Sequence, residues 1–325
     1  MNNENIHRVH IFDKQLIVKF LNEHWGSAHP LVNNPQLFDY YYSDGEWTNF
    51  YVLEDESGIV SICGYIKSSK EENSDIWISI WCAKKGKNGL GLALMGAMQQ
   101  LTGAKIISCN NIREKTMPFY TFLGYYPDKL NHYYRLRDLD EYKIAWVTDK
   151  NILPCHKAKG VWLKQFFDIE EVKADFHIPQ GLKPQKDYWY IEKRYFKYPH
   201  YKYNLFGVYN GEDCLSLVVF RVNEGCEGNV LRLVDFIGAP ANFCLLNGFI
   251  DDLILQYDCE YCDMYSFGVD GVCAGFTQRI GEEVIIPNYL DPLWKKNIDY
   301  FFFTSDKEGF TMFKADGDQD RKNLG

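Results

Sequence analysis

One succession of elements occurs twice along the chain, and it constrains the fold more than any other feature of the sequence. In each half, three segments of alternating apolar and polar residues are followed by a helical segment, a fourth strand-like segment and a short helix. The interval from Gly89 to Gly124 is 35 residues, and the interval from Pro240 to Gly275 is also 35 residues. We therefore predict two related domains in tandem.

The predicted fold class is α/β in the broad α+β sense, with two tandem domains, each a mixed, mostly antiparallel sheet flanked by helices. The first domain is predicted to span residues 1–140 and the second residues 141–325. The predicted strands are Asn49–Glu54, Ile59–Ile66, Ile76–Cys82, Lys105–Ser108, Tyr133–Leu136, Asn204–Tyr209, Cys214–Val222, Asn229–Phe236 and Tyr261–Ser266. The main predicted helices are Leu16–Glu23, Pro35–Tyr42, Leu92–Leu101, Ile112–Leu123, Lys159–Phe176 and Phe243–Tyr257.

Composition and charge exclude several classes of function. The formal net charge is −9 and the pI about 5.4, the opposite of the basic surface that nucleic-acid binding requires. The N-terminus is polar, without the apolar core of a signal peptide, and no apolar run approaches the roughly 20 residues of a membrane span. We therefore expect a cytoplasmic protein whose 10 cysteines are reduced thiols. We expect no metal site, because the lone pair Cys259-x-x-Cys262 supplies too few ligands.

A glycine-rich turn, Lys84-Lys85-Gly86-Lys87-Asn88-Gly89-Leu90-Gly91, joins the third strand-like segment to the next helix. A helix N-terminus offers free backbone N–H groups and a partial positive charge, and glycines let the backbone approach a pyrophosphate closely. The turn is not a dinucleotide-binding fingerprint, since antiparallel strands are expected before it, and it lacks the Gly-Lys-Ser/Thr of a Walker A loop. Taken alone, it does not distinguish a phosphate site from a plain strand-to-helix connection.

The segment downstream of the turn narrows the choice. The chain here has a strand, a Gly-x-Gly turn, a helix, a strand and a helix that ends in Tyr120-x-x-Leu123-Gly124-Tyr125. This order resembles the GNAT superfamily of acyl-coenzyme A N-acyltransferases, and the resemblance covers about Leu16–Leu136. The turn matches the family's Q/R-x-x-G-x-G pattern except at its first position, Gly86, where Lys85 or Lys87 would have to supply the side-chain contact. The resemblance implies acetyl-coenzyme A as co-substrate. The implied cofactor contacts are Trp81, Cys82, Ala83, Lys87, Asn88, Gly89, Leu90, Gly91 and Asn111.

The same resemblance implies roles for three more side chains, each with a structural alternative. Tyr120 lies where the family often has a tyrosine that protonates the leaving thiolate, and the alternative is packing in a helix face. Trp25 and His29 are four residues apart, which would place both on one helix face near the acceptor. His29 would accept a proton from the attacking ammonium, or it caps a helix before Pro30. Trp25 would stack on a sugar or base, or it packs in the core.

Several strings across nearly the whole chain are similar to a narrower group, the tandem GNAT-like proteins of bacterial surface-polysaccharide gene clusters. They are Trp25-x-x-x-His29, Ile76–Trp81, Val234–Gly238, Ile286–Tyr289 and the tail Phe313–Arg321. This similarity implies N-acylation of an amino sugar, expected to be nucleotide-linked, during glycan assembly. Asp235, at the end of a strand, and Asn288, after a proline turn, are candidate substrate contacts.

The tail string Asp316-Gly317-Asp318-Gln319-Asp320-Arg321 begins like a calcium loop, but Arg321 stands where that loop requires glycine. It is either an acidic turn paired with Arg321 or a polar wall for a hydroxyl-rich substrate. The second half lacks the glycine turn, and Pro240 has no N–H to offer a phosphate, so we predict one coenzyme A site. Two other functions stay open. One is transfer of an amino acid from charged tRNA, against which the pyrophosphate turn and acidic pI argue, and the other is a non-catalytic scaffold.

Overall fold

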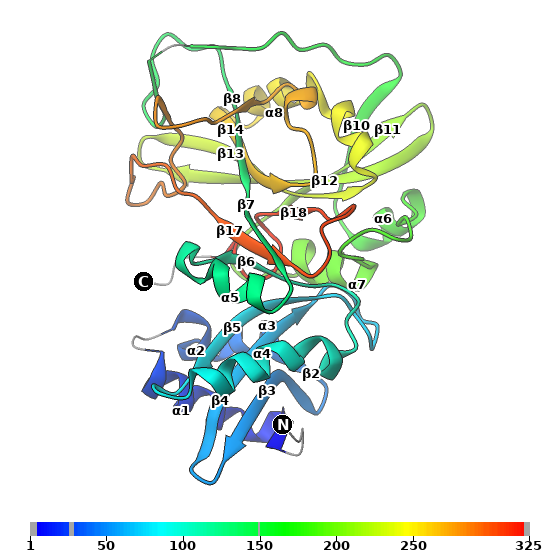
Figure 1. Cartoon of the computed structure of the whole chain (residues 1–325). Coiled ribbons are helices and arrows are strands. Elements are labelled where there is room, and N and C mark those ends of the chain that lie inside the picture. Colours follow the sequence, from blue (N-terminus) through cyan, green and yellow to red (C-terminus); the bar gives the residue numbers. More distant parts are fainter. Residues whose placement is uncertain (1–4, 26–28, 149, 322–325) are drawn as a thin grey trace.

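The computed structural model describes residues 5–25, 29–148 and 150–321. Two eight-stranded sheets lie one above the other in Figure 1, each with helices packed against it. The predicted fold class, two mixed and mostly antiparallel sheets flanked by helices, is confirmed. No helix within the described ranges is both long and apolar enough to cross a membrane.

The first sheet has the strand order β1-β3-β4-β5-β6-β17-β7, with β2 paired to β3. Its neighbours run antiparallel except for β5 and β6, which are parallel. The strands are β1 Ile6–His10, β2 Ser43–Asp44, β3 Trp47–Asp55, β4 Gly58–Lys67, β5 Ile76–Ala83, β6 Ile107–Ile112, β7 Tyr126–Lys129 and β17 Phe301–Thr304.

The second sheet has the order β10-β11-β12-β13-β14-β8-β15, with β18 paired to β14. Only β13 and β14 are parallel. The strands are β8 Asn131–Leu136, β10 Val161–Phe166, β11 Asn204–Asn210, β12 Asp213–Gly225, β13 Gly228–Gly238, β14 Cys259–Phe267, β15 Thr277–Gln278 and β18 Met312–Phe313. A small third sheet pairs β9, Trp146–Val147, with β16, Val284–Ile285.

The two large sheets repeat one topology and exchange one strand each. In both orders the fourth and fifth strands form the parallel pair, and the sixth position is taken by a strand from the other half of the chain. β17 enters the first sheet between β6 and β7, and β8 enters the second between β14 and β15. The strands are therefore not divided between the sheets at the predicted boundary of residues 140 and 141.

Helices cover both faces of the first sheet. The α-helices of the chain are α1 Lys14–His24, α2 Pro30–Asn33, α3 Pro35–Tyr42, α4 Asn88–Thr102, α5 Met117–Phe122, α6 Ile169–Asp175, α7 Tyr188–Ile191 and α8 Phe249–Gln256. The short 3-10 helices are η2 Ile11–Asp13, η3 Glu114–Thr116, η5 Pro240–Leu246 and η6 Val272–Ala274, and η4 Glu192–Phe196 is a π-helix. On one face, α4 buries Leu94, Met95 and Met98. On the other, residues of α1 and α3 share a core with Tyr190 of α7 and Val234 of β13, so one apolar core joins the halves.

Three predicted helices are wrong in part. The segment Lys159–Phe176 forms β10 and then α6, because Val161 and Leu163 alternate with Trp162, whose ring stacks on Tyr209 of β11 at 4.1 Å. The alternating pattern therefore forms a strand, and the helix begins only after Asp168, whose side chain caps the N-terminus of α6. The second, Phe243–Tyr257, is split into η5 and α8 by Gly248, which has a φ of 81°. The third, Ile112–Leu123, is an α-helix only from Met117, because Ile112 pairs with Phe301 as the last residue of β6 and Glu114–Thr116 forms η3.

Candidate functional site

The first feature of the site is an opening between the parallel strands β5 and β6. They pair at only two positions, the last of which joins Trp77 to Ser108. β5 stays paired with β4 as far as Ala83, so beyond Trp77 the backbone groups on its other edge face the opening. A register shift leaves Ser79 without a partner in β4, and such a bulge bends a strand. An extended ligand can add to this edge as a further strand would, beside the predicted contacts Trp81, Cys82 and Ala83.

The N-terminus of α4 lies at the end of this edge. Leu90 and Gly91 donate their N–H groups to the carbonyl of Lys87 at 3.0 and 3.1 Å. The N–H groups of Asn88 and Gly89 have no acceptor among the described residues, and both residues are exposed. Because α4 is 15 residues long, its first turn carries the partial positive charge of the helix dipole. These two N–H groups are therefore available to an anion such as a pyrophosphate.

The two glycines of the Gly-x-Gly turn do different things. A Cβ added to Gly91 would lie 2.9 Å from the Cβ of Ala83, and the Gly91 carbonyl accepts a 3.0 Å hydrogen bond from Trp81 Nε1. A Cβ added to Gly89 would have no heavy atom within 4 Å. Gly91 thus lets α4 pack closely on β5, whereas Gly89 keeps the space in front of the helix open.

The lysines of the turn also differ from one another. Lys87 Nζ lies 2.8 Å from Asp55 Oδ2, and this hydrogen bond holds the pKa of Asp55 well below its usual range. Lys85 is exposed and forms no ion pair within the part of the chain that is described. A phosphate contact from Lys87 would compete with Asp55, so Lys85 is the more available of the two predicted substitutes for the family's Gln or Arg.

Tyr120 lies on α5, beside the opening. Its ring stacks on Phe303 of β17, with centroids 4.3 Å apart, and its centroid is 6.1 Å from that of Trp81. Burial raises the pKa of the phenol well above its ordinary value, so the hydroxyl stays protonated and can donate a proton or a hydrogen bond. Sequence reasoning missed Phe303, because no local pattern connects β17 to the first half of the chain.

Trp25 and His29 do not share a helix. Trp25 follows α1, His29 precedes α2, and residues 26–28 lie outside the described residues. The two rings meet edge to face with centroids 5.2 Å apart. His29 Nδ1 accepts a 3.3 Å hydrogen bond from the N–H of Leu31, so the predicted capping role is present.

The capping bond bears on the second role predicted for His29. Burial, and secondarily Arg321, lowers the pKa of His29 to about 4, which makes the imidazole neutral near pH 7. Since Nδ1 accepts the hydrogen bond, the proton of the neutral ring belongs on Nε2. His29 can act as a base only through Nδ1, after the bond to Leu31 opens. The base role therefore stays a prediction.

The C-terminal tail lies against the same region. Asn110 donates from Nδ2 to the carbonyls of Phe313 and Asp316 at 3.0 and 3.3 Å, and Asn111 donates to Gln319 Oε1 at 2.7 Å. The predicted cofactor contact Asn111 is thus engaged with the tail. Asp318 forms an ion pair with Arg321, and both lie near enough to His29 to shift its pKa, in opposite directions. The predicted pairing of the acidic turn with Arg321 is present.

The two candidate substrate contacts of the second half lie in separate buried networks. Asp235 is fully buried and accepts hydrogen bonds from Lys186 Nζ at 2.6 and 2.7 Å and from the Tyr195 hydroxyl. Lys186 Nζ also lies 2.7 Å from Asp316, so a substrate would have to displace an ammonium to reach Asp235.

Asn288 is also buried. Its Nδ2 donates to the Tyr300 hydroxyl at 2.7 Å, and its carbonyl accepts from Arg232 at 3.2 Å. Its Oδ1 has no partner among the described residues. Within the described part of the chain, neither Asp235 nor Asn288 forms a hydrogen bond or ion pair with Tyr120 or His29, so these predicted contacts do not meet in one network.

The corresponding gap in the second sheet is filled by the chain itself. β13 and β14 pair as far as Leu233 and Met264, and beyond that point β18 pairs with β14. The N–H of Ala315 then donates to the carbonyl of Val234 at 2.9 Å. The helix that follows β13 begins as the 3-10 stretch η5, with Pro240 in its first turn. Among its described residues, this half therefore offers neither a free strand edge nor a glycine turn at the equivalent position.

Comparisons with known proteins support the fold assignment. The sequence matches no protein-family model and no curated protein. A GCN5-related N-acetyltransferase from Anabaena variabilis is similar in structure, with a TM-score of 0.55 and 10% identity over 92% of this chain and 71% of that chain. A conserved protein of unknown function from Enterococcus faecalis, a probable N-acyltransferase, gives a TM-score of 0.51 and 11% identity over the same shares, 92% and 71%. At these identities the likeness shows that the chain has the GNAT fold.

Proposed function

We propose that the chain is an acyl-coenzyme A-dependent N-acyltransferase with one cofactor site, at the opening between β5 and β6. The observation that supports this most is the unpaired edge of β5, which leads directly to two free N–H groups at the start of α4. The edge suits an extended pantetheine arm, and the N–H groups suit a pyrophosphate. The open space in front of Gly89 leaves room for both. The residues present therefore fit coenzyme A.

Acetyl-coenzyme A, when bound, supplies an activated acyl group. Transfer forms a bond between the acceptor nitrogen and the acyl carbon and breaks the carbon–sulfur bond. In this proposal the Tyr120 hydroxyl gives a proton to the departing sulfur, and N–H groups on the β5 edge stabilise the negative charge that develops on the carbonyl oxygen. The acceptor ammonium loses two protons in all: one replaces the proton that Tyr120 gave to the sulfur, and the other passes to a base. The candidate is His29 Nδ1, once its bond to Leu31 has opened.

The proposed acceptor is an amino sugar, expected to be nucleotide-linked, and the proposed setting is bacterial surface-glycan assembly. This part of the proposal rests on the similarity of the strings from Trp25 to Arg321 to tandem GNAT-like proteins of polysaccharide gene clusters. The surroundings of His29 are compatible with a hydroxylated substrate, since the Trp25 ring and the polar tail pair Asp318 and Arg321 lie close to it.

The test combines cofactor binding with turnover. Thermal unfolding is measured with and without acetyl-coenzyme A for the wild type, for Gly89→Trp, and for Gly96→Trp as a control, because Gly96 is an exposed residue two turns further along α4. We expect stabilisation of the wild type and of the control, and none of Gly89→Trp. Thiol release from acetyl-coenzyme A is then followed with a panel of nucleotide-linked amino sugars. An unstabilised wild type contradicts the cofactor site, whereas stabilisation without release for any sugar contradicts only the acceptor.

A further inference from the structure

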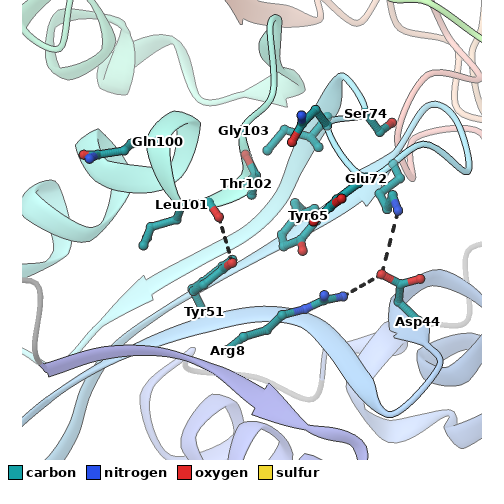
Figure 2. A pocket seen from close by; sticks show the side chains of 13 residues that line it. Arg8, Asp44, Tyr51, Tyr65, Glu72, Ser74, Gln100, Leu101, Thr102 and Gly103 are labelled. Atoms are coloured by element: carbon teal, nitrogen blue, oxygen red, sulfur yellow. Dashed lines mark hydrogen bonds and ion pairs between the residues drawn. The ribbon is translucent and has the colours of Figure 1, made fainter.

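A cavity with a volume of about 320 Å³ lies at the C-terminal end of α4, away from the glycine turn. Because α4 has 15 residues and a helix rises by about 1.5 Å per residue, its two ends are about 20 Å apart. Figure 2 shows the cavity between the end of α4 and strands of the first sheet. The side chains that matter here are those of Arg8, Asp44, Tyr65, Lys67 and Glu72.

Three cations surround one carboxylate at this cavity. Arg8 Nη2 donates to Asp44 Oδ2 at 2.7 Å, and Lys67 Nζ lies 3.8 Å from the same oxygen. Lys193 lines a second, much smaller cavity that also includes Lys67. Burial raises the pKa of Asp44, but Arg8, Lys67 and Lys193 together outweigh burial and lower it. Lys67 and Lys193 therefore both act on a carboxylate that Arg8 already holds.

The ammonium groups of Lys67 and Lys193 have no hydrogen-bond acceptor among the described residues. The side chain of Lys67 is only 12% exposed, and its ammonium has no hydrogen-bond acceptor among the described residues. Lys193 is half-buried, and its ammonium lies over the rings of Tyr40 and Trp189, at 5.1 and 4.9 Å from their centroids. Burial lowers the pKa of Lys193 to about 8, with Asp44 opposing this shift and Lys67 adding to it. Asp44, at 3.8 Å, is the only ion-pair partner of Lys67 among the described residues, and Arg8 already donates to the same oxygen. Keeping two ammonium groups from water with one shared carboxylate is costly, and a bound anion lowers that cost.

We propose that Lys67, backed by Lys193, binds the anionic group of a small metabolite, a phosphate or a carboxylate, in the cavity at the C-terminal end of α4. The cavity is at the lower end of the size range of small-molecule sites, roughly 300 to 1,000 Å³. The Tyr65 hydroxyl forms no hydrogen bond with the described residues and is a ready donor to the ligand. Glu72, which is exposed and lines the same cavity, opposes the anion. This site is independent of the proposed acyl transfer.

The test titrates the full chain with inorganic phosphate by calorimetry, and in a second arm with acetate, at an ionic strength held constant with chloride. We expect saturable binding in the millimolar range or tighter, and the stronger arm identifies the group as phosphoryl or carboxylate. Lys67→Gln should weaken binding about tenfold or more, because it removes the charge nearest to the ligand. Glu72→Gln should tighten it several-fold for the opposite reason. Lys70→Gln, at an exposed lysine outside the cavity, is the matched control and should leave binding unchanged.

Three results would overturn the proposal. One is the absence of saturable binding of either anion to the wild type. Another is an equal loss in Lys67→Gln and Lys70→Gln, which would mean a diffuse effect of charge. The third is loss of phosphate binding in Gly89→Trp but not in Lys67→Gln, which would place the anion at the glycine turn. Lys67→Arg keeps the charge and should keep binding, so a folding defect in Lys67→Gln is recognised by comparison of the two. Failure of acetyl-coenzyme A to bind would leave these outcomes unaffected.

Discussion

Phe303, from a strand close to the C-terminus, stacks on Tyr120 of the first half with ring centroids 4.3 Å apart and planes inclined by 23°. Phe303 belongs to β17, which lies in the first sheet between β6 and β7. The side chain proposed to protonate the leaving group is therefore packed against a residue 183 positions away in sequence, and the second half contributes to the candidate site of the first. Each half depends on the other for one strand of its sheet, so neither half is expected to work alone.

The first prediction concerns this packing. Phe303 is fully buried, so Phe303→Ala should lower the free energy of unfolding by about 3 to 5 kcal/mol, through lost apolar burial and the cavity that remains. Phe122→Ala is the control, because that ring is 80% exposed and its loss should change stability by less than about 0.5 kcal/mol. Urea unfolding measures both values. Equal stabilities for the two variants would mean that β17 does not belong to the core of the first sheet.

The second prediction isolates the Tyr120 hydroxyl. Tyr120→Phe keeps the stacked ring and removes the proton donor, so kcat should fall roughly 10²-fold while KM for acetyl-coenzyme A stays within about threefold. Tyr125→Phe is a matched control, because Tyr125 stacks on the same Phe303 ring, with centroids 4.9 Å apart. Its kinetics should match the wild type. If kcat of Tyr120→Phe also matches the wild type, Tyr120 has only a packing role.

The third prediction decides the role of Asp235. Asp235→Asn leaves the buried Lys186 ammonium with Asp316 as its remaining carboxylate, so it should destabilise the fold by about 3 to 5 kcal/mol. The control Asp213→Asn, at an exposed residue of β12, should change stability by less than about 0.5 kcal/mol. Melting and KM for the acceptor are measured together. Unchanged stability with a raised KM would show that Asp235 contacts substrate, as the sequence alone predicted.

The fourth prediction follows from the pKa of His29, which is lowered from 6.5 to about 4 on folding. The unfolded chain then binds a proton at a pH where the folded protein does not. The associated stability, about 3 kcal/mol, is fully present above pH 6.5 and is lost as the pH falls towards 4. Urea unfolding at about pH 7 and about pH 5 should show this loss in the wild type and a smaller loss in His29→Gln. The same loss in both proteins would assign the effect to other groups.

Sequence patterns predicted the local elements well where apolar periodicity and glycine signals agree. The predicted strands Ile59–Ile66 and Ile76–Cys82 correspond to β4 and β5, and the helix after the glycine turn corresponds to α4. The apolar pattern around Trp162 led to a wrong helix prediction. Val161 and Leu163 pack against one core as strand residues, but the same segment also has apolar residues at helical spacing. The partner of Trp162, Tyr209, decides the outcome, and cross-strand pairs are not visible in a local window.

The site was predictable only in its contiguous part. The turn and β5 are continuous in sequence, so the glycine turn could be seen as a pattern, and the family resemblance then made Gly89 and Trp81 candidate contacts. The exchange of β8 and β17 joins residues that are far apart along the chain, and no periodicity encodes such pairing. The cation cluster was missed for the same reason, since Lys67 and Lys193 lie in different halves and belong to no motif.

The most direct test of the proposed function is the stoichiometry of acetyl-coenzyme A binding, measured by isothermal titration calorimetry on the full chain. Because the β5 edge and the first turn of α4 are open while β18 and the tail fill the equivalent gap of the second sheet, we predict one site per chain. Gly89→Trp should abolish binding, and Gly96→Trp should preserve it. No binding to the wild type, two sites per chain, or full binding to Gly89→Trp would contradict the account.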